Sequence, residues 1–173
     1  NQAALSYNGV TTLSNIAVGE LVEVLTATKT AADTTYTAGG VKTFVISLVN
    51  SSAAALTGLT VTDTLGSYTF SGNTLYPLTY VTGSLLYYVN GALQATPTVT
   101  ATAPLTVTGV TVPAGGSAML IYTARVNEYA PLGVEDSITN TATITGGGLT
   151  SSVTATETIN ASPAPQLAIS KSI

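Results

Sequence analysis

The most constraining feature of this sequence is a strictly alternating segment near its C-terminal end, residues 137–145. Ile138, Asn140, Ala142 and Ile144 fall on one side of this segment, and threonines occupy the positions between them. A two-residue period of this kind is typical of a half-buried β-strand. The segment therefore predicts a strand whose inward face carries a single amide side chain.

Both ends of the chain repeat pieces of its middle. Residues 1–6 parallel residues 140–145, and residues 167–173 parallel residues 25–31. The chain thus begins with what reads as the last strand of one unit and ends with what reads as the first strand of another. Such a chain is suited to joining end to end, either as a polymer of identical copies or as one unit of a tandem array, in which case the two ends are ordinary flanks.

Other alternating segments, separated by turns rich in Gly, Pro and Asn, extend the strand pattern along the whole chain. Asn8-Gly9 and Asn90-Gly91 each lie between two alternating segments, a strong hairpin signal. No window favours a helix. We expect strands at 2–7, 10–18, 25–31, 41–50, 56–65, 85–89, 92–95, 105–112, 117–127, 137–145, 149–159 and 167–173.

This pattern predicts an all-β fold, an antiparallel immunoglobulin-like β-sandwich with strand extensions at both termini. Residues 1–21 are expected to form an N-terminal strand or hairpin extension, and residues 22–160 the sandwich. Residues 161–173, which contain two prolines, are expected to form a stiff linker and a C-terminal donor strand. Because the chain begins at Asn1, we also expect that a leader or an initiator methionine has been removed.

The composition excludes several classes of function. Lys and Arg together number four, so we expect no nucleic-acid partner. No apolar segment approaches the roughly 20 residues that a membrane-spanning helix needs, which argues against membrane insertion. The chain has no Cys and no His, and therefore no disulfide, thiol nucleophile or imidazole base. We predict no cofactor and no enzymatic activity on an external substrate.

The order of motifs resembles a known family, the DUF11 conserved-repeat domains of surface proteins from Gram-positive bacteria and some archaea. The resemblance covers about residues 25–145 and rests on segments that appear in the family's order. It implies tandem sandwich domains at a cell surface, and hence an extracellular protein on a cell or a spore. The sequence is also similar to the fimbrial domains that form internal isopeptide bonds. The matching segments are 25–31, 36–46, 49–50, 59–65, 112–116 and 138–142.

Three polar residues, Lys29, Asp63 and Asn140, lie on the apolar phase of their strands. Burial favours the uncharged forms of an amine and of a carboxyl group. A neutral Lys29 amine is the nucleophile needed to attack the Asn140 amide, and a protonated Asp63 would polarise the amide carbonyl. In agreement with the fimbrial resemblance, we predict an isopeptide bond formed with loss of ammonia. The alternative is a buried Lys29–Asp63 ion pair, with Asn140 hydrogen-bonded to backbone.

The terminal strands suggest how copies of the chain would join. Lys171 shares the apolar phase of the C-terminal strand, and Asn1 shares a phase with Ala3 and Leu5. If the C-terminal strand of one copy lies beside the N-terminal strand of the next, Lys171 meets Asn1 and a covalent link between subunits becomes feasible. Strand donation without a covalent bond requires only a sheet edge and pockets for alternate side chains. The donated apolar residues are Leu167, Ile169 and Ile173.

We therefore predict a structural subunit of an extracellular, pilus-like fibre that polymerises with copies of itself by donating a terminal strand. A head-to-tail contact that does not close into a ring propagates as a filament. The alternative is an adhesive or spacer module of a modular surface protein. In that case a glycan or host-surface ligand would bind to the aromatic side chains Tyr68, Tyr76, Tyr80, Tyr87 and Tyr88.

Overall fold

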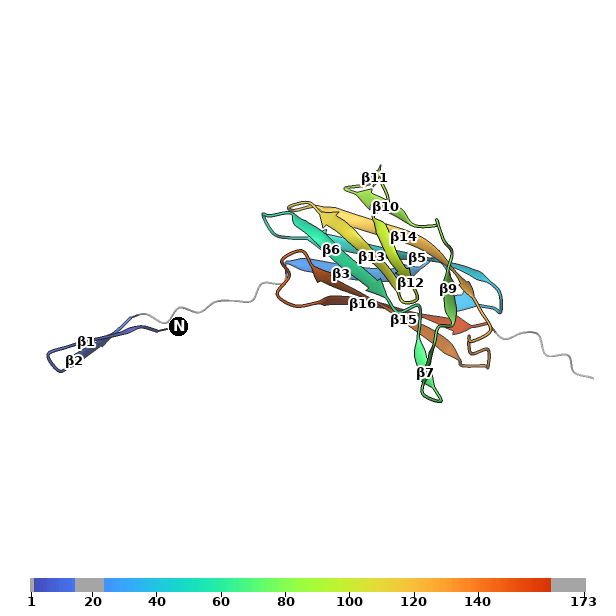
Figure 1. Ribbon diagram of the computed structural model, residues 1–173, viewed down its shortest axis with the longest axis horizontal. Helices are drawn as coiled ribbons and strands as arrows, with labels where there is room; N and C mark the ends of the chain where they lie inside the picture. Colours follow the sequence, from blue (N-terminus) through green and yellow to red (C-terminus); the bar gives the residue numbers. More distant parts are fainter. Residues whose placement is uncertain (1, 15–23, 163–173) are drawn as a thin grey trace, which may run out of the picture.

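The computed structural model describes residues 2–14 and 24–162, and within them every regular element is a β-strand. Most of these strands form two six-stranded sheets that pack face to face (Figure 1). The predicted all-β sandwich is confirmed. In the described part of the chain, no helix is long and apolar enough to cross a membrane.

The first sheet contains five strands in the order β11-β10-β14-β5-β3, and a sixth, β9, also pairs with β14. All of its neighbouring strands are antiparallel. The strand β3 forms one edge of this sheet. The bounds are β3 Leu25–Ala31, β5 Val41–Asn50, β9 Leu78–Tyr80, β10 Leu86–Val89, β11 Ala92–Gln94 and β14 Ser117–Val126.

The second sheet has the order β12-β13-β6-β15-β16-β4 and contains the alternating segment around Asn140 as strand β15. Its only parallel pair is β16 with β4, which covers just the last two residues of β16. A separate hairpin, β7 Tyr68–Phe70 with β8 Asn73–Leu75, leaves the sandwich as a small arm (Figure 1). The bounds are β4 Thr35–Tyr36, β6 Leu56–Asp63, β12 Thr98–Thr102, β13 Leu105–Val112, β15 Ser137–Gly146 and β16 Val153–Ala161.

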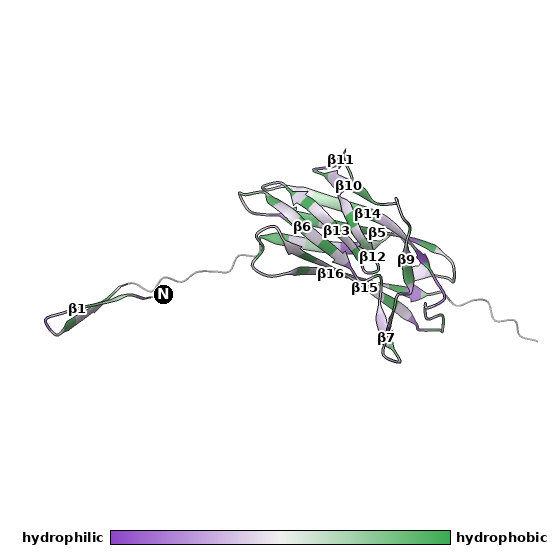
Figure 2. Ribbon diagram, viewed as in Figure 1, coloured by the Kyte–Doolittle hydropathy of each residue, from purple (hydrophilic) through white to green (hydrophobic). Residues whose placement is uncertain are grey.

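The core lies between the two sheets and is built from the inward residues of each alternating strand. Strand β5 alternates between buried and less buried positions along its whole length, and β14 shows the same pattern. Figure 2 shows apolar and polar residues interleaved along the strands. The largest fully buried side chains include Tyr36, Phe44 and Tyr122. The aromatic residues therefore fill the core more than they cover the surface.

Residues 2–14 form the predicted N-terminal hairpin, with strands β1 Ala4–Tyr7 and β2 Val10–Leu13. Asn8 and Gly9 both have positive φ, 51° and 76°, as a type I′ hairpin turn requires. Every residue of this hairpin is exposed, including Leu5, whose exposed fraction is 73%. The predicted boundary between residues 21 and 22 lies outside the described residues, and β16 extends to Ala161, one residue into the predicted linker.

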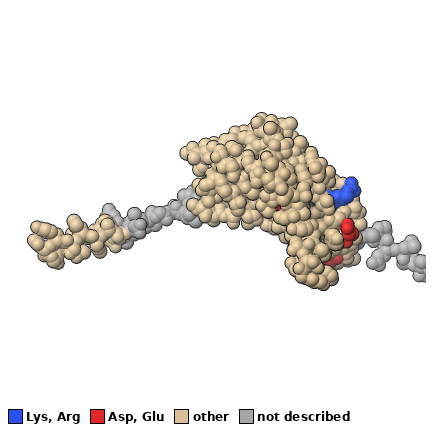
Figure 3. Space-filling model, in the orientation of Figure 1, with Lys and Arg blue, Asp and Glu red and all other residues tan. Residues whose placement is uncertain are grey.

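The chain enters and leaves the sandwich at opposite ends. Val24 accepts a hydrogen bond from Ser51 at the end where β5 finishes, whereas Ser162 donates one to Tyr36 at the end where β5 begins. In the view of Figure 3, most of the visible charged side chains lie near one end of the sandwich. The two points at which the chain enters and leaves the sandwich therefore lie at its opposite ends.

Candidate functional site

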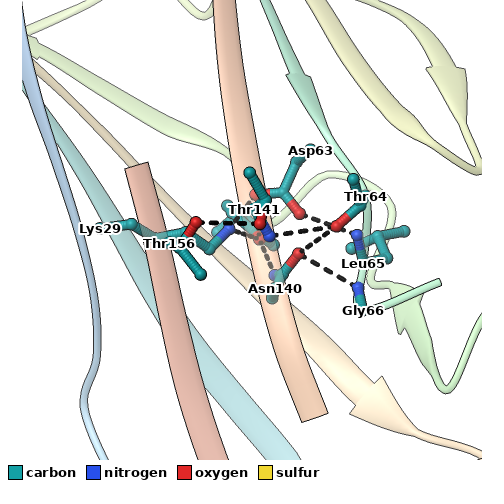
Figure 4. Close-up of polar contacts among 9 residues, drawn as sticks. Lys29, Asp63, Thr64, Leu65, Gly66, Asn140, Thr141 and Thr156 are labelled. Atoms are coloured by element: carbon teal, nitrogen blue, oxygen red, sulfur yellow. Dashed lines mark hydrogen bonds and ion pairs between the residues drawn. The ribbon is translucent and has the colours of Figure 1, made fainter. Parts of the chain in front are cut away.

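The three polar residues that the strand phase singled out lie together inside the sandwich, close to the end at which the chain leaves it. Lys29 comes from β3 in the first sheet, and Asp63 and Asn140 come from β6 and β15 in the second. Their exposed fractions are 4%, 1% and 0%. Figure 4 shows the three side chains converging. The sequence-based prediction that these residues point inward is therefore confirmed.

Lys29 is held by a charge and by two aromatic rings. Its Nζ forms an ion pair with Asp63 Oδ2 and donates a 3.0 Å hydrogen bond to the Tyr122 hydroxyl. The same nitrogen lies 5.0 Å from the centre of the Phe44 ring and 5.3 Å from that of the Tyr122 ring. These two rings stack on each other, with centroids 5.5 Å apart. The amine is thus enclosed on the aromatic side and oriented toward the carboxylate.

Asp63 is the last residue of β6 and occupies the centre of the cluster. Besides the ion pair, its Oδ2 accepts a 2.7 Å hydrogen bond from the Tyr122 hydroxyl. Its Oδ1 accepts a 3.0 Å hydrogen bond from the Leu65 backbone N–H. A carboxylate with these three donors is well satisfied in spite of its burial.

Asn140 is oriented by partners on both ends of its amide. Its Oδ1 accepts hydrogen bonds from the Thr64 hydroxyl and the Gly66 backbone N–H, each 3.2 Å long. Its Nδ2 donates a 3.1 Å hydrogen bond to the Tyr122 hydroxyl. The prediction that Asp63 polarises this carbonyl differs from the structure, in which the donors are Thr64 and Gly66 and Asp63 contacts the Lys29 amine and the Tyr122 hydroxyl.

Burial changes the protonation equilibria of the cluster. Burial lowers the pKa of the Lys29 amine, and the nearby Asp63 carboxylate partly offsets that effect. For the Tyr122 hydroxyl, burial and then the charge of Asp63 raise the pKa well above its ordinary value of 10.0. Burial therefore shifts the amine toward its neutral form and keeps the phenol protonated. These are the forms needed for nucleophilic attack and for hydrogen-bond donation.

The arrangement is compatible with both interpretations of the sequence. It contains the expected Lys29–Asp63 ion pair, and among the described residues each buried side-chain nitrogen and oxygen has a partner. It also brings an amine and an amide to the same tyrosine hydroxyl. Because β3 and β15 belong to different sheets, a bond between Lys29 and Asn140 would cross the core and not join neighbouring strands.

The remaining predicted residues belong to the chain ends. Ala3 and Leu5 lie in the described N-terminal hairpin and are exposed. Asn1, Leu167, Ile169, Lys171 and Ile173 lie outside the described residues, so the predicted contact between Lys171 and Asn1 stays a prediction.

The predicted tyrosine surface is largely absent. Tyr80 and Tyr87 are buried, and Tyr76 and Tyr88 are half-buried. Tyr68 is exposed on the β7 arm, and its hydroxyl donates to the Tyr129 carbonyl. Alternation in strands places most of these rings in the core.

Sequence reasoning missed four contributors to the site: Phe44, Thr64, Gly66 and Tyr122. Tyr122 follows Ala118 and Leu120 on the inward phase of β14, so its hydroxyl was a detectable polar group on an apolar face. Thr64 could have been suspected only because it directly follows Asp63 in the sequence. The contribution of Gly66 is a backbone N–H, for which the side-chain pattern gives no sign.

No protein-family model and no curated protein sequence matches this chain, so membership of DUF11 stays a prediction. Solved structures do resemble it. The pilus backbone protein RrgB of Streptococcus pneumoniae aligns with a TM-score of 0.54 and 14% identity, over 70% of this chain and 31% of that one. BcpA, the major pilin subunit of Bacillus cereus, aligns with a TM-score of 0.53 and 16% identity, over 92% and 47%.

A third resemblance is to the N-terminal domain of the Streptococcus gordonii adhesin Sgo0707, with a TM-score of 0.57 and 16% identity, over 79% of this chain and 32% of that one. The chain therefore spans about a third to a half of these neighbours. At such low identity the comparisons define a class of fold. The sandwich is of the kind found in pilins and adhesins of Gram-positive bacteria.

Proposed function

We propose that this chain is a structural subunit of an extracellular, pilus-like fibre, stabilised by an isopeptide bond between Lys29 and Asn140. The observation that carries the proposal is the buried cluster that joins the two sheets of a pilin-like sandwich. Lys29, Asp63, Tyr122 and Asn140 are within hydrogen-bonding contact of one another through the Tyr122 hydroxyl and the Asp63 carboxylate. Buried charges are rare unless paired. In this pair the lysine amine also lies near the Asn140 amide, which it could attack.

The reaction is a transamidation. The proton of Lys29 moves to Asp63, and the neutral amine attacks Cγ of Asn140. The bond between Cγ and Nδ2 breaks, a bond between Cγ and the lysine nitrogen forms, and ammonia leaves with the displaced proton. No oxidant or cofactor is required, because an amide is exchanged for an amide. The product would join β3 to β15 and so tie one sheet to the other.

Polymerisation would proceed head to tail. The two chain connections of the sandwich lie at opposite ends, which suits a linear array. The N-terminal hairpin exposes apolar residues, and a two-stranded hairpin is marginally stable alone in water. Strand β3 is the last strand of its sheet in the described chain and lies beside β16 of the other sheet, and in this proposal an incoming strand would pair with the backbone of β3 at that edge. In this proposal the donor is the strand at 167–173, and the fibre lies on the surface of a cell or a spore.

Electron microscopy of the purified chain tests polymerisation. We expect the full chain to form filaments and a chain lacking residues 166–173 to remain folded and monomeric. Filaments that persist unchanged after this deletion would show that strand donation from the C-terminal end is wrong. Intact mass spectrometry tests the isopeptide separately, since the bonded chain is lighter than its sequence mass by one ammonia.

A second candidate function, an adhesive module, has one observation in its favour. A surface pocket of about 400 Å³ lies beside the β7 arm and is lined by Gly66, Tyr68, Pro77, Pro131 and Ile138, among others. An exposed tyrosine at an apolar hollow is suited to stacking on a sugar ring. A glycan-binding module would remain monomeric in the micrographs and bind glycan arrays, with loss of binding in Tyr68→Ala.

A further inference from the structure

The Asn140 carbonyl accepts hydrogen bonds from two donors at once, the backbone N–H that the ion-pair interpretation expects and, in addition, a side-chain hydroxyl. The Thr64 hydroxyl and the Gly66 N–H both point at Oδ1, from the tight turn that follows β6 (Figure 4). A preorganised pair of donors aimed at one carbonyl oxygen is the arrangement that stabilises the oxyanion of a tetrahedral intermediate.

The direction of the Thr64 hydroxyl is fixed by its other partner. Thr64 Oγ1 accepts a 3.1 Å hydrogen bond from the Thr141 backbone N–H, and the Thr64 N–H donates in turn to the Thr141 carbonyl, at 2.9 Å. Because a hydroxyl has one proton, accepting from Thr141 leaves that proton for the Asn140 oxygen. Thr64 is thus a donor locked onto the strand that carries the amide.

The Gly66 donor is fixed by the backbone of the turn. Leu65 and Gly66 have φ of 52° and 71°, and a Cβ at position 66 would lie 2.3 Å from Ile138 Cγ2. Positive φ and the absence of a side chain allow the backbone to approach β15 closely. In the same turn the Leu65 N–H binds Asp63 Oδ1, so one turn positions both the carboxylate and the oxyanion donor.

Tyr122 contacts every reacting group. Its hydroxyl accepts from Lys29 Nζ at 3.0 Å and from Asn140 Nδ2 at 3.1 Å, and donates to Asp63 Oδ2 at 2.7 Å. Asp63 makes no hydrogen bond to the departing nitrogen Nδ2 within the described residues, whereas the Tyr122 hydroxyl contacts both the Asp63 carboxylate and Nδ2. A proton from the carboxyl group therefore reaches the leaving nitrogen by the shortest route through this hydroxyl.

We propose that Thr64 and Gly66 form the oxyanion hole of the isopeptide reaction, and that Tyr122 carries the proton from Asp63 to the departing ammonia. This inference rests on the proposed isopeptide. The Lys29 nitrogen adds to Cγ, and the negative charge that develops on Oδ1 is held by the two donors. Asp63 gives the proton that it took from Lys29 to the Tyr122 oxygen, and Tyr122 gives its own proton to Nδ2. The carbonyl then reforms and the bond between Cγ and Nδ2 breaks. Asp63 accepts the second amine proton of Lys29 and passes it to the released ammonia, which leaves as the ammonium ion.

The test follows the reaction in newly made protein. The full chain is synthesised in a cell-free system, and the fraction that has lost ammonia is measured against time by intact mass. We expect Thr64→Val to slow bond formation on the order of 100-fold or more, as is typical when one oxyanion donor is removed. Tyr122→Phe keeps the ring but loses the proton carrier, and we expect a slowing on the order of 100-fold. Thr64→Ser keeps the hydroxyl and should restore most of the rate.

Two matched controls separate these effects from damage to the fold. Thr62→Val makes the same change two residues away on β6, where the side chain is half-buried, and Tyr80→Phe removes the hydroxyl from a ring 6.2 Å from that of Tyr122. Both should form the bond at the wild-type rate. Near-ultraviolet circular dichroism verifies that each variant has folded.

The outcomes distinguish the two proposals. If the wild-type chain loses ammonia and Thr64→Val and Tyr122→Phe react equally fast, the oxyanion hole and the proton route are wrong and the isopeptide stands. If the folded wild-type chain never loses ammonia, the isopeptide itself is wrong and this inference with it. If Thr64→Val fails to fold, the comparison of Tyr122→Phe with Tyr80→Phe still decides the proton route, and Thr64→Ala compared with Thr64→Ser decides the donor.

Discussion

Tyr122 is the residue that connects the buried cluster, and its hydroxyl has a consequence for stability that does not depend on any covalent bond. The folded state holds this phenol protonated, because burial and the adjacent carboxylate raise its pKa. In the unfolded chain neither burial nor the carboxylate acts on Tyr122, so its pKa returns to the ordinary value. The protonation of one side chain is thereby linked to the folding equilibrium.

The alkaline stability of the protein should reveal this linkage. Between about pH 10 and the raised pKa of Tyr122, the unfolded chain has lost the proton that the folded chain keeps, so the free energy of unfolding falls as pH rises. The lowered pKa of Lys29 acts with the opposite sign, because stability from that group increases with pH up to about its ordinary value of 10.5. We expect Asn140→Ala to lose stability more steeply above pH 10 than Asn140→Ala with Tyr122→Phe.

Guanidinium titrations between about pH 8 and pH 11 measure this difference. Asn140→Ala prevents bond formation in both proteins. Both also retain Lys29, so the pH dependence of stability that this residue contributes is present in each. Stability curves that stay parallel through this range would contradict a raised pKa for Tyr122.

Two neighbouring glycines provide a second prediction at this scale. Gly147 and Gly148 both have positive φ, 61° and 87°, but a Cβ at Gly147 would lie 2.5 Å from Leu59 Cδ2, whereas nothing lies within 4 Å at Gly148. The backbone penalty is of the same kind at both, roughly 1–2 kcal/mol. We expect Gly147→Ala to be the more destabilising by about 1–3 kcal/mol, the usual cost of overpacking a core. Chemical denaturation of the two variants measures it, and equal losses would show that Leu59 moves aside freely.

At the scale of elements, the two-residue period predicted most long strands well. The strands Val41–Asn50 and Leu105–Val112 have the bounds expected from the sequence, because each is closed by a turn. Val41–Asn50 alternates without interruption, whereas the buried phase of Leu105–Val112 changes at Gly109, where its pairing with β6 is irregular. The short strands β4, β7, β8, β9 and β12 were not predicted. They contain two to five residues, which is short for a two-residue period to be recognised. In addition, β4 and β9 pair with strands distant in the sequence, whereas β7 with β8 and β12 with β13 are local hairpins. The strand expected from residue 149 begins only at Val153, after the glycine-rich loop.

The site was predictable to a similar extent. Lys29, Asp63 and Asn140 could be found because a charged or amide side chain interrupts an apolar phase. The hydroxyl of Tyr122 gives a weaker signal of the same kind, since a tyrosine ring itself suits an apolar face. The Gly66 N–H depends on a turn with two consecutive positive φ values, a geometry that the alternation of side chains does not describe.

The N-terminal hairpin makes a prediction of its own. The register pairs Tyr7 with Val10 and Leu5 with Thr12, so Leu5, Tyr7 and Val10 share one face. Burying a large apolar side chain contributes about 1.5–3 kcal/mol. If this face packs on another copy, Leu5→Ser with Tyr7→Ser should weaken self-association at least tenfold and leave the melting temperature of the sandwich unchanged.

Sedimentation velocity and calorimetry together measure these two effects. Ser6→Ala, on the opposite face of the hairpin, is the control and should change neither. Self-association of undiminished strength in the double variant would exclude this face from the interface.

At the scale of the whole molecule, the proposed bond would change the topology of the chain and not only its packing. It would close a loop from Lys29 on one sheet to Asn140 on the other, which contains most of the sandwich. A cross-link around a loop of roughly 100 residues removes conformational entropy from the unfolded chain worth between about 4 and 5 kcal/mol. The stabilisation therefore acts on the unfolded state, where native hydrogen bonds are absent.

This property allows the bond to be tested apart from the contacts that Asn140 makes in the folded protein. In concentrated guanidinium, the bonded wild-type chain should have a smaller radius of gyration than Asn140→Ala, because its ends are attached to a closed loop and not to a linear chain. Small-angle X-ray scattering of the two denatured proteins measures the difference. Asn50→Ala is the control: it removes another buried asparagine that binds backbone carbonyls, and its denatured chain should match wild type. Equal dimensions for the denatured wild type and Asn140→Ala would mean that the two sheets are held together by the Lys29–Asp63 ion pair and packing alone.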